Sequence, residues 1–145
     1  MKTKNKNQNT FITLIMVVVL IAGVFVFIRY TMNRTIEEPE VIISQGEITI
    51  TGMYGESYSL SAITDLQLVE GTPQLGRKVN GAGLSSRKVY KGQYEVEGLG
   101  KCRVFLIGDE GLYIKMETEE ETVLIMYDDS QQTIDLFEDL IDVMH

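Results

Sequence analysis

The chain has 145 residues, enough for one ordinary domain with an appendage, and its 13 Lys and Arg against 21 Asp and Glu give a net charge of −8. Every acid follows Arg34, so the part after that residue carries 8 positive and 21 negative side chains, a net of −13. A domain this acidic is soluble and repelled by nucleic acid, so we expect no nucleic-acid partner.

An apolar run comes first in the chain. After a basic tail, residues 1–10, residues 11–29 are predicted to form a transmembrane helix. The stretch Phe11–Ile28 has no charge, and as a helix it spans roughly 27 Å, close to the hydrocarbon thickness of a bilayer. A cleaved signal peptide is the alternative, but its apolar region is usually shorter and ends in an A-x-A-like site, which this stretch lacks. We therefore predict an uncleaved single-pass anchor in the cell membrane.

The charges that flank the run predict its orientation. Three lysines precede it, and two arginines, Arg29 and Arg34, follow. Because an excess of Lys and Arg marks the cytoplasmic side, this count favours an inside N terminus and an extracytoplasmic domain. Residues 30–39 are predicted to be a short polar tether, with Pro39 stopping any helix that continues from the membrane.

From Glu40 the apolar residues recur with a period of two between glycine turns. This pattern is typical of short, half-buried antiparallel strands, and seven or eight such runs occur before residue 128. One run places Cys102, Val104 and Leu106 on the same face. We therefore interpret Cys102, the only cysteine, as a small core residue.

The period becomes helical near the C terminus. Asp129 or Ser130 is placed to cap a final helix, whose far face carries acids. One amphipathic helix after a series of strands must bury its stripe on them, which predicts a strongly bent sheet or partly open barrel closed at one end by that helix. The apolar stripe consists of Ile134, Phe137, Leu140, Ile141 and Met144.

A glycine-rich basic stretch separates the two groups of strands, and we expect it to form a loop of about 20 residues. Residues 75–103 carry seven positive side chains against Glu95 and Glu97, a net of +5. They could bind an anionic partner such as a lipid head group, an envelope polyanion or an acidic protein face. Alternatively they pair with the domain's own carboxylates or solvate the loop. The candidate binding residues are Arg77, Lys78, Arg87, Lys88 and Lys91.

Several short motifs follow one another along the predicted strands and the final helix: Gly52-Met53-Tyr54-Gly55, Pro73-Gln74-Leu75-Gly76-Arg77, Asn80-Gly81, Gly92-Gln93-Tyr94, Gly98-Leu99-Gly100-Lys101, and Leu136 with Leu140. Together with the order of elements, they resemble the bacterial pleckstrin-homology (PH) domain family over about residues 40–142, and we predict a PH-like domain over residues 40–145. The resemblance implies a mainly β fold, a strongly bent seven-stranded barrel with one C-terminal helix, but no known activity. Eukaryotic relatives that bind phosphoinositides place basic residues in an early hairpin loop. The early turns here contain none, which speaks against phosphoinositide binding.

Catalytic and cofactor motifs do not emerge from the sequence. The glycines do not fit a P-loop or a dinucleotide fingerprint, and His145, the terminal residue, is the only histidine. We predict no cofactor, no metal and no enzymatic activity. The expected function is a protein-interaction or scaffolding module that binds a protein partner or self-associates through a strand edge; binding of an anionic ligand and an enzyme with an unrecognised site are the alternatives.

Overall fold

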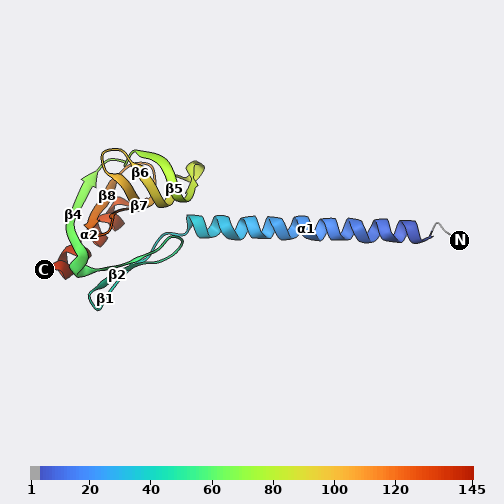
Figure 1. Cartoon of the computed structure of the whole chain (residues 1–145), viewed down its shortest axis with the longest axis horizontal. Helices are drawn as coiled ribbons and strands as arrows, with labels where there is room; N and C mark the ends of the chain where they lie inside the picture. The colour runs from blue at the N-terminus through green and yellow to red at the C-terminus, as the bar shows by residue number, and fades with distance from the viewer. Residues whose placement is uncertain (1–3) are drawn as a thin grey trace. The chain divides into compact units, whose positions relative to one another are not determined.

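The computed structural model describes residues 4–145, and their side chains from residue 10 onward. The chain divides into two units, Met1–Arg34 and Thr35–His145, which are treated separately below (Figure 1). Helix α1, Lys4–Ile36, fills the described part of the first unit and ends two residues into the second. It is long and apolar enough to cross a membrane, as predicted. The predicted tether over 30–39 is wrong in its first part, because residues through Ile36 continue the helix.

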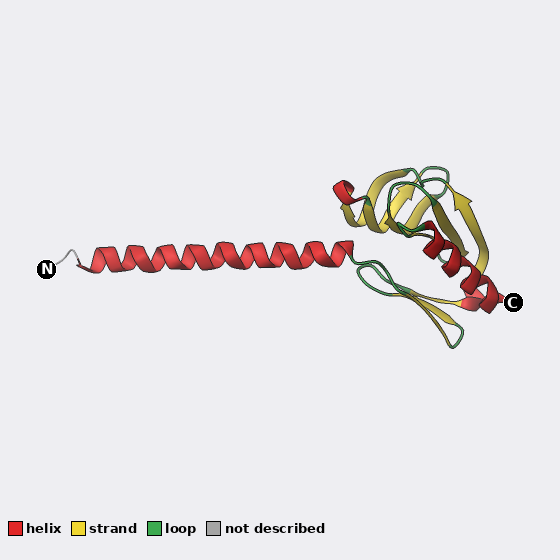
Figure 2. Ribbon diagram, turned by 180° about the vertical axis from the view of Figure 1, so that it is seen from behind, coloured by secondary structure: helices red, strands yellow, loops and turns green. Residues whose placement is uncertain are grey.

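The second unit contains nine strands, two short 3-10 helices and the C-terminal helix α2, Ser130–Met144 (Figures 1 and 2). The strands are β1 (Val41–Ser44), β2 (Glu47–Ile50), β3 (Ser57–Ser59), β4 (Ile63–Glu70), β5 (Leu75–Leu84), β6 (Val89–Val96), β7 (Gly100–Ile107), β8 (Leu112–Thr118) and β9 (Thr122–Met126). The 3-10 helices are η1 (Leu60–Ala62) and η2 (Ser85–Arg87). The fold is thus mainly β with a closing helix, as the sequence predicted.

The strands form two sheets rather than the seven-stranded barrel that we expected. One sheet has the order β1-β2-β3, and the other has the order β4-β8-β9-β7-β6-β5. The second order does not close on itself, because β4 and β5 are both edge strands. The prediction of antiparallel pairing also fails at one place, where β7 and β9 run parallel.

The buried central strands explain that failure. Val104–Ile107 in β7 and Val123–Met126 in β9 are continuous apolar runs, and all of their side chains are buried. Strands buried on both faces read as continuous hydrophobic runs, which is the usual pattern of parallel pairs. The alternating pattern that we assigned to these strands describes only one of their two buried faces.

The six-stranded sheet must be strongly bent. Six strands in a flat sheet place the two edges roughly 24 Å apart. The edge strands β4 and β5 are nevertheless joined by only the four residues Gly71–Gln74, which reach at most about 17 Å when fully extended. The sheet therefore curls toward this connection, as Figure 2 shows. Pro73 and Gln74 lie beside Tyr94, Leu106 and Met126, so the connection crosses one face of the sheet.

Each face of the sheet carries its own apolar cluster. The first core lies between one face, helix α2 and the small sheet; it includes Phe105, Ile114 and Ile125 from the large sheet and Ile48 from β2. The second core lies on the opposite face and includes Cys102, which is fully buried as predicted. Alternate residues of β7 and β9 contribute to the two cores, so these strands hold the domain together.

Helix α2 buries a stripe shifted from the predicted one. Its buried residues are Thr133, Leu136 and Leu140, whereas the predicted Met144 is exposed. Asp129 caps the helix, as one of the two predicted candidates, by accepting a hydrogen bond from the backbone N–H of Gln131 at 2.9 Å. Thr133 is tolerated in the core because its hydroxyl accepts a hydrogen bond from the backbone N–H of Tyr127 at 3.1 Å.

Candidate functional site

The five predicted binding residues lie on a β-hairpin rather than in a loop. Arg77 and Lys78 belong to β5, Arg87 and Lys88 to the connection, and Lys91 to β6. The five successive residues Gly76 to Asn80 are exposed and show no alternation of apolar side chains, so we predicted a loop and not a strand. The sequence signal for this strand is a cluster of small residues, Gly81, Ala82 and Gly83. At Gly81 and Gly83 a side chain would collide with the rings of Tyr94 and Tyr90, which pack across the hairpin.

Two of the five cations already have carboxylate partners in the domain. Arg77 Nη2 lies 2.9 Å from Glu95 Oε1, and Lys88 Nζ lies 3.0 Å from Asp109 Oδ1. The hydrogen bonds to these carboxylates raise the pKa of Arg77 and of Lys88. All four side chains are well exposed, so both pairs are weak and a partner could displace them. Both pairs agree with the alternative that these cations pair with the domain's own carboxylates, and the binding role of the two residues stays a prediction.

Lys91 is buried, and the structure places it away from the surface. Its residue is 1% exposed, and its ammonium group donates a hydrogen bond to the backbone oxygen of Glu37. Burial lowers the pKa of Lys91, partly offset by the charges of Glu37 and Glu38. Lys91 therefore holds the segment that follows helix α1 against the domain.

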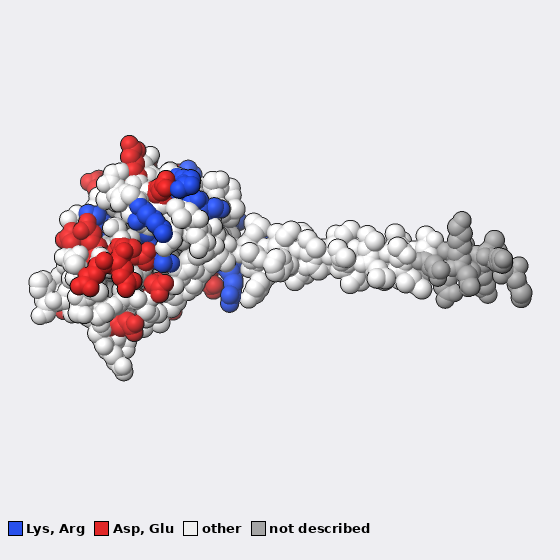
Figure 3. Space-filling model, in the orientation of Figure 1, with Lys and Arg blue, Asp and Glu red and all other residues white. Residues whose placement is uncertain are grey.

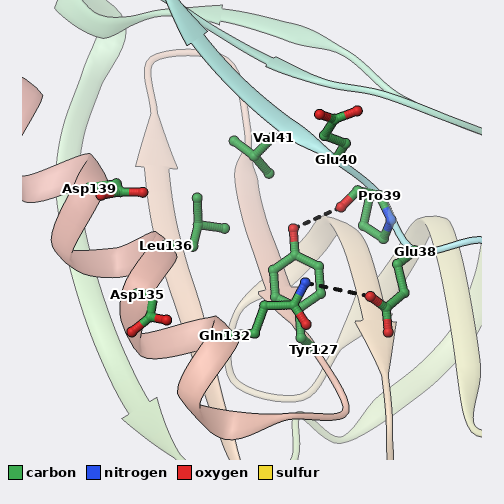
Figure 4. A pocket seen from close by; sticks show the side chains of 9 residues that line it. All are labelled: Glu38, Pro39, Glu40, Val41, Tyr127, Gln132, Asp135, Leu136 and Asp139. Carbon is green, nitrogen blue, oxygen red and sulfur yellow. Dashed lines mark hydrogen bonds between the residues drawn. The ribbon is translucent and has the colours of Figure 1, made fainter.

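The same segment has further contacts with the domain, which Figure 4 shows. The hydroxyl of Tyr127 donates to the backbone oxygen of Pro39 at 2.8 Å, and the side-chain amide of Gln132 donates to Glu38 at 3.5 Å. A pocket of about 350 Å³ opens here, lined partly by the carboxylates of Glu38, Glu40, Asp135 and Asp139. No set of three or more His, Cys, Asp or Glu in the described residues is placed to hold a metal ion.

Lys78 and Arg87 are the two remaining candidates. Both are exposed, and within residues 10–145 neither has an ion-pair partner. They stand at the two ends of the regular part of β5, where Asn80–Leu84 pairs without interruption with Val89–Gln93. The structure thus leaves two unpaired cations that flank a short stretch of edge strand. On the face shown in Figure 3, basic and acidic side chains of the domain gather on different parts of the surface.

The β5 edge presents backbone groups that no strand of the domain pairs with. Strand β5 has ten residues and only β6 as a neighbour, so the peptide groups on its outer side have no strand partner. The register shifts between Leu75 and Lys78 and again before Asn80. Such irregularities hinder the pairing of an edge with another strand, and they leave Asn80–Leu84 as the regular portion of β5. Val79, 43% exposed, stands beside that portion.

A second pocket adjoins the beginning of this strand. It has a volume of about 320 Å³, and its apolar lining comes from Pro73, Leu75, Tyr90, Leu106 and Met126. The ion pair between Lys88 and Asp109 lies at its rim. A cavity of this size and polarity is suited to an apolar side chain or a small ligand.

Comparison of the chain with models of protein families, with curated proteins and with solved structures found no match.

Proposed function

We propose that the chain is a membrane-anchored, non-catalytic interaction module that holds a protein partner along the β5 edge. The proposal depends on one observation: β5 is a long edge strand whose residues Gly76–Asn80 are all exposed. Exposed edges bind extended segments through main-chain hydrogen bonds, and the neighbouring side chains select the partner. Lys78 and Arg87 would select a partner with carboxylates.

Membership of the bacterial PH domain family and an extracytoplasmic location are parts of the same proposal. The bent sheet and the C-terminal helix support the family assignment. The parallel pair β7–β9 and the separate three-stranded sheet differ from the barrel that the resemblance implies. The location rests on the distribution of Lys and Arg around helix α1.

A photocrosslinking side chain in place of Val79 tests the interaction. Val143, on helix α2, provides a matched control because it is the same residue type and is 42% exposed, against 43% for Val79. Each full-length variant is produced in its native membrane, irradiated and analysed by mass spectrometry. We expect a discrete protein adduct from position 79 and none of the same mass from position 143. Equal adducts from both positions, or none from position 79, would contradict the proposal.

Binding of an anionic ligand is a second candidate, favoured by the unpaired cations Lys78 and Arg87. Binding through these residues must weaken steeply as ionic strength rises, whereas main-chain pairing along the edge depends little on salt. The full-length chain in nanodiscs is titrated with anionic lipid vesicles and with a soluble polyphosphate at low and high salt. If neither probe binds at low salt, this candidate fails and the protein-interaction proposal is unaffected.

A further inference from the structure

The two edges of the large sheet carry opposite charges. Strand β5 has Arg77 and Lys78 and no acid, and β4 has Asp65 and Glu70 and no Lys or Arg. Both strands are long, and each has one strand neighbour, β8 for β4 and β6 for β5. Each molecule therefore presents a basic edge and an acidic edge of the same sheet.

The two edge strands, β4 and β5, also have the same sense when the sheet is traced from one hydrogen-bonded neighbour to the next. Going along the sheet from β5, the direction reverses at β6 and again at β7, is kept at the parallel neighbour β9, and reverses at β8 and at β4. A second copy whose sheet continues the first beyond β5 therefore offers its β4 parallel to that strand, rotated as the twist of the sheet requires.

The charged side chains Asp65 of β4 and Lys78 of β5 also lie on the same face of the sheet. Leu66 and Leu68 pack on the first core, so Asp65 lies on the opposite face of β4. Lys78 is opposite Tyr94, which belongs to the second core, so it lies on that same opposite face of β5. If Leu66–Glu70 of one copy is placed beside Asn80–Leu84 of another, the bulge at Val79 brings Asp65 next to Lys78.

We propose that the partner at the β5 edge is the β4 edge of a second copy of this chain, paired in parallel with Asp65 beside Lys78. This inference rests on the proposed function and names its partner. Because the two surfaces differ, each copy keeps one free edge of each kind, and the contact builds rings or open rows in the membrane. Confinement to one membrane raises the effective concentration of the copies and so supports pairing through a small contact.

Zero-length carbodiimide coupling tests the contact directly, since it joins a lysine to a carboxylate only when the two touch. Full-length chains grown with light and heavy nitrogen are mixed in proteoliposomes, coupled and digested. We expect a linked peptide that joins Lys78 of one isotope to Asp65 of the other. Lys78→Arg should abolish the link, because a guanidinium is not acylated, while the assembly measured by sedimentation in detergent persists.

Reversing the charge at Lys78 or at Asp65 provides a second test of the contact. Lys78→Glu alone and Asp65→Lys alone should each reduce assembly by about tenfold, the effect expected when an opposite-charge contact becomes a like-charge one. A mixture of the two variants should restore it, because every contact in the mixed assembly again joins opposite charges. Lys101→Glu, an exposed position at the start of the central strand β7, is the matched control and should leave assembly unchanged. Thermal unfolding checks that all variants fold.

Three outcomes overturn the inference: no link between isotopes, no recovery in the mixture, or an equal loss with Lys101→Glu. Coupling of Lys78 to a carboxylate of another protein would also overturn it, but would leave the interaction proposed for the β5 edge intact. That broader proposal fails if the photocrosslinker at Val79 yields no protein adduct, or the same adduct as position 143.

Discussion

The ammonium group of Lys91, in strand β6, donates a hydrogen bond to the backbone oxygen of Glu37, 54 residues earlier in the chain. The bond joins the interior of the domain to the segment that leaves helix α1. Together with the bond from Tyr127 to Pro39, it turns residues that we expected to be a tether into part of the domain.

Replacing Lys91 by Met should release this segment. The methionine retains most of the apolar packing but leaves the Glu37 oxygen without its donor, a loss of about 1–3 kcal/mol in the local opening free energy. Hydrogen exchange followed by mass spectrometry on a peptide covering residues 35–41 should show faster exchange than in the wild type. Lys101→Met is the control, since Lys101 is exposed, and it should leave this exchange unchanged.

The pKa of Lys91 makes a separate prediction about pH. Burial lowers this pKa in the folded state, so the unfolded chain binds more protons between the folded value and the unfolded value of about 10.4. Wild-type stability should therefore rise with pH across that window, and the cost of the buried charge is fully present below the folded pKa of Lys91. Urea unfolding of the full chain in detergent at pH 7 and at pH 9.5 measures this change in the free energy of unfolding. In Lys91→Met, the part of the rise that comes from the titration of Lys91 should be absent. An identical pH dependence in both proteins would contradict the assignment.

A polar network joins the small sheet to the large one. Glu121 accepts hydrogen bonds from Arg103 Nε at 2.6 Å and from the hydroxyl of Tyr58 at 2.8 Å. The side chains of Arg103 and Glu121 are only 15% and 17% exposed, so removing the Arg103 charge leaves the Glu121 carboxylate largely buried without its cationic partner. Arg103→Met should therefore lower the free energy of unfolding by about 1–3 kcal/mol.

The network is tested by a double-mutant cycle in urea. Tyr58→Phe alone should lower the free energy of unfolding by about 1 kcal/mol, because the Glu121 carboxylate loses the hydrogen bond that the Tyr58 hydroxyl donates. If the network acts as a unit, the double variant Arg103→Met, Tyr58→Phe should lose less than the sum of the two single losses. Strict additivity would show that the two bonds to Glu121 are independent.

The sequence predicted the elements with strong local signals. The burial of Cys102 and the cap at Asp129 depend on neighbouring residues, and both are confirmed. The apolar helix was equally evident, since its length and lack of charge need no tertiary context. Its end at Ile36 was missed because contacts of the following residues with Lys91 and Tyr127 are remote in sequence.

The candidate site was less predictable for the same reason. Charge counting found the basic segment, but it could not distinguish an exposed edge strand from a loop, because neither buries an alternating apolar face. It also grouped Lys91 with Arg77, although the two differ completely in exposure. Strand order decides which strands are edges, and it depends on the long-range pairs β7–β9 and β4–β8, for which a single sequence carries little signal.

Gly81 should resist substitution because the hairpin is closely packed there. A Cβ at this position would lie 2.4 Å from the backbone oxygen of Lys91 and 3.1 Å from the ring of Tyr94. Gly81→Ala should therefore lower the free energy of unfolding by about 1–3 kcal/mol. Gly76→Ala, in the same strand, is the control; its nearest contact is 3.3 Å, so the loss should be smaller. Equal losses at the two positions would show that Gly81 is not closely packed.

Membrane orientation can be tested on intact cells. Because three lysines precede the apolar helix and two arginines follow it, the domain should lie outside the cytoplasm. Protease added to intact cells should then remove the domain while a cytoplasmic marker survives. Replacing the three lysines, Lys2, Lys4 and Lys6, by Gln leaves the excess of Lys and Arg on the C-terminal side of the apolar helix. A large share of the chains should then insert in the opposite orientation, and their domains should be protected from the protease. Complete protection of the wild-type domain would place it in the cytoplasm and would restrict partners of the β5 edge to that compartment.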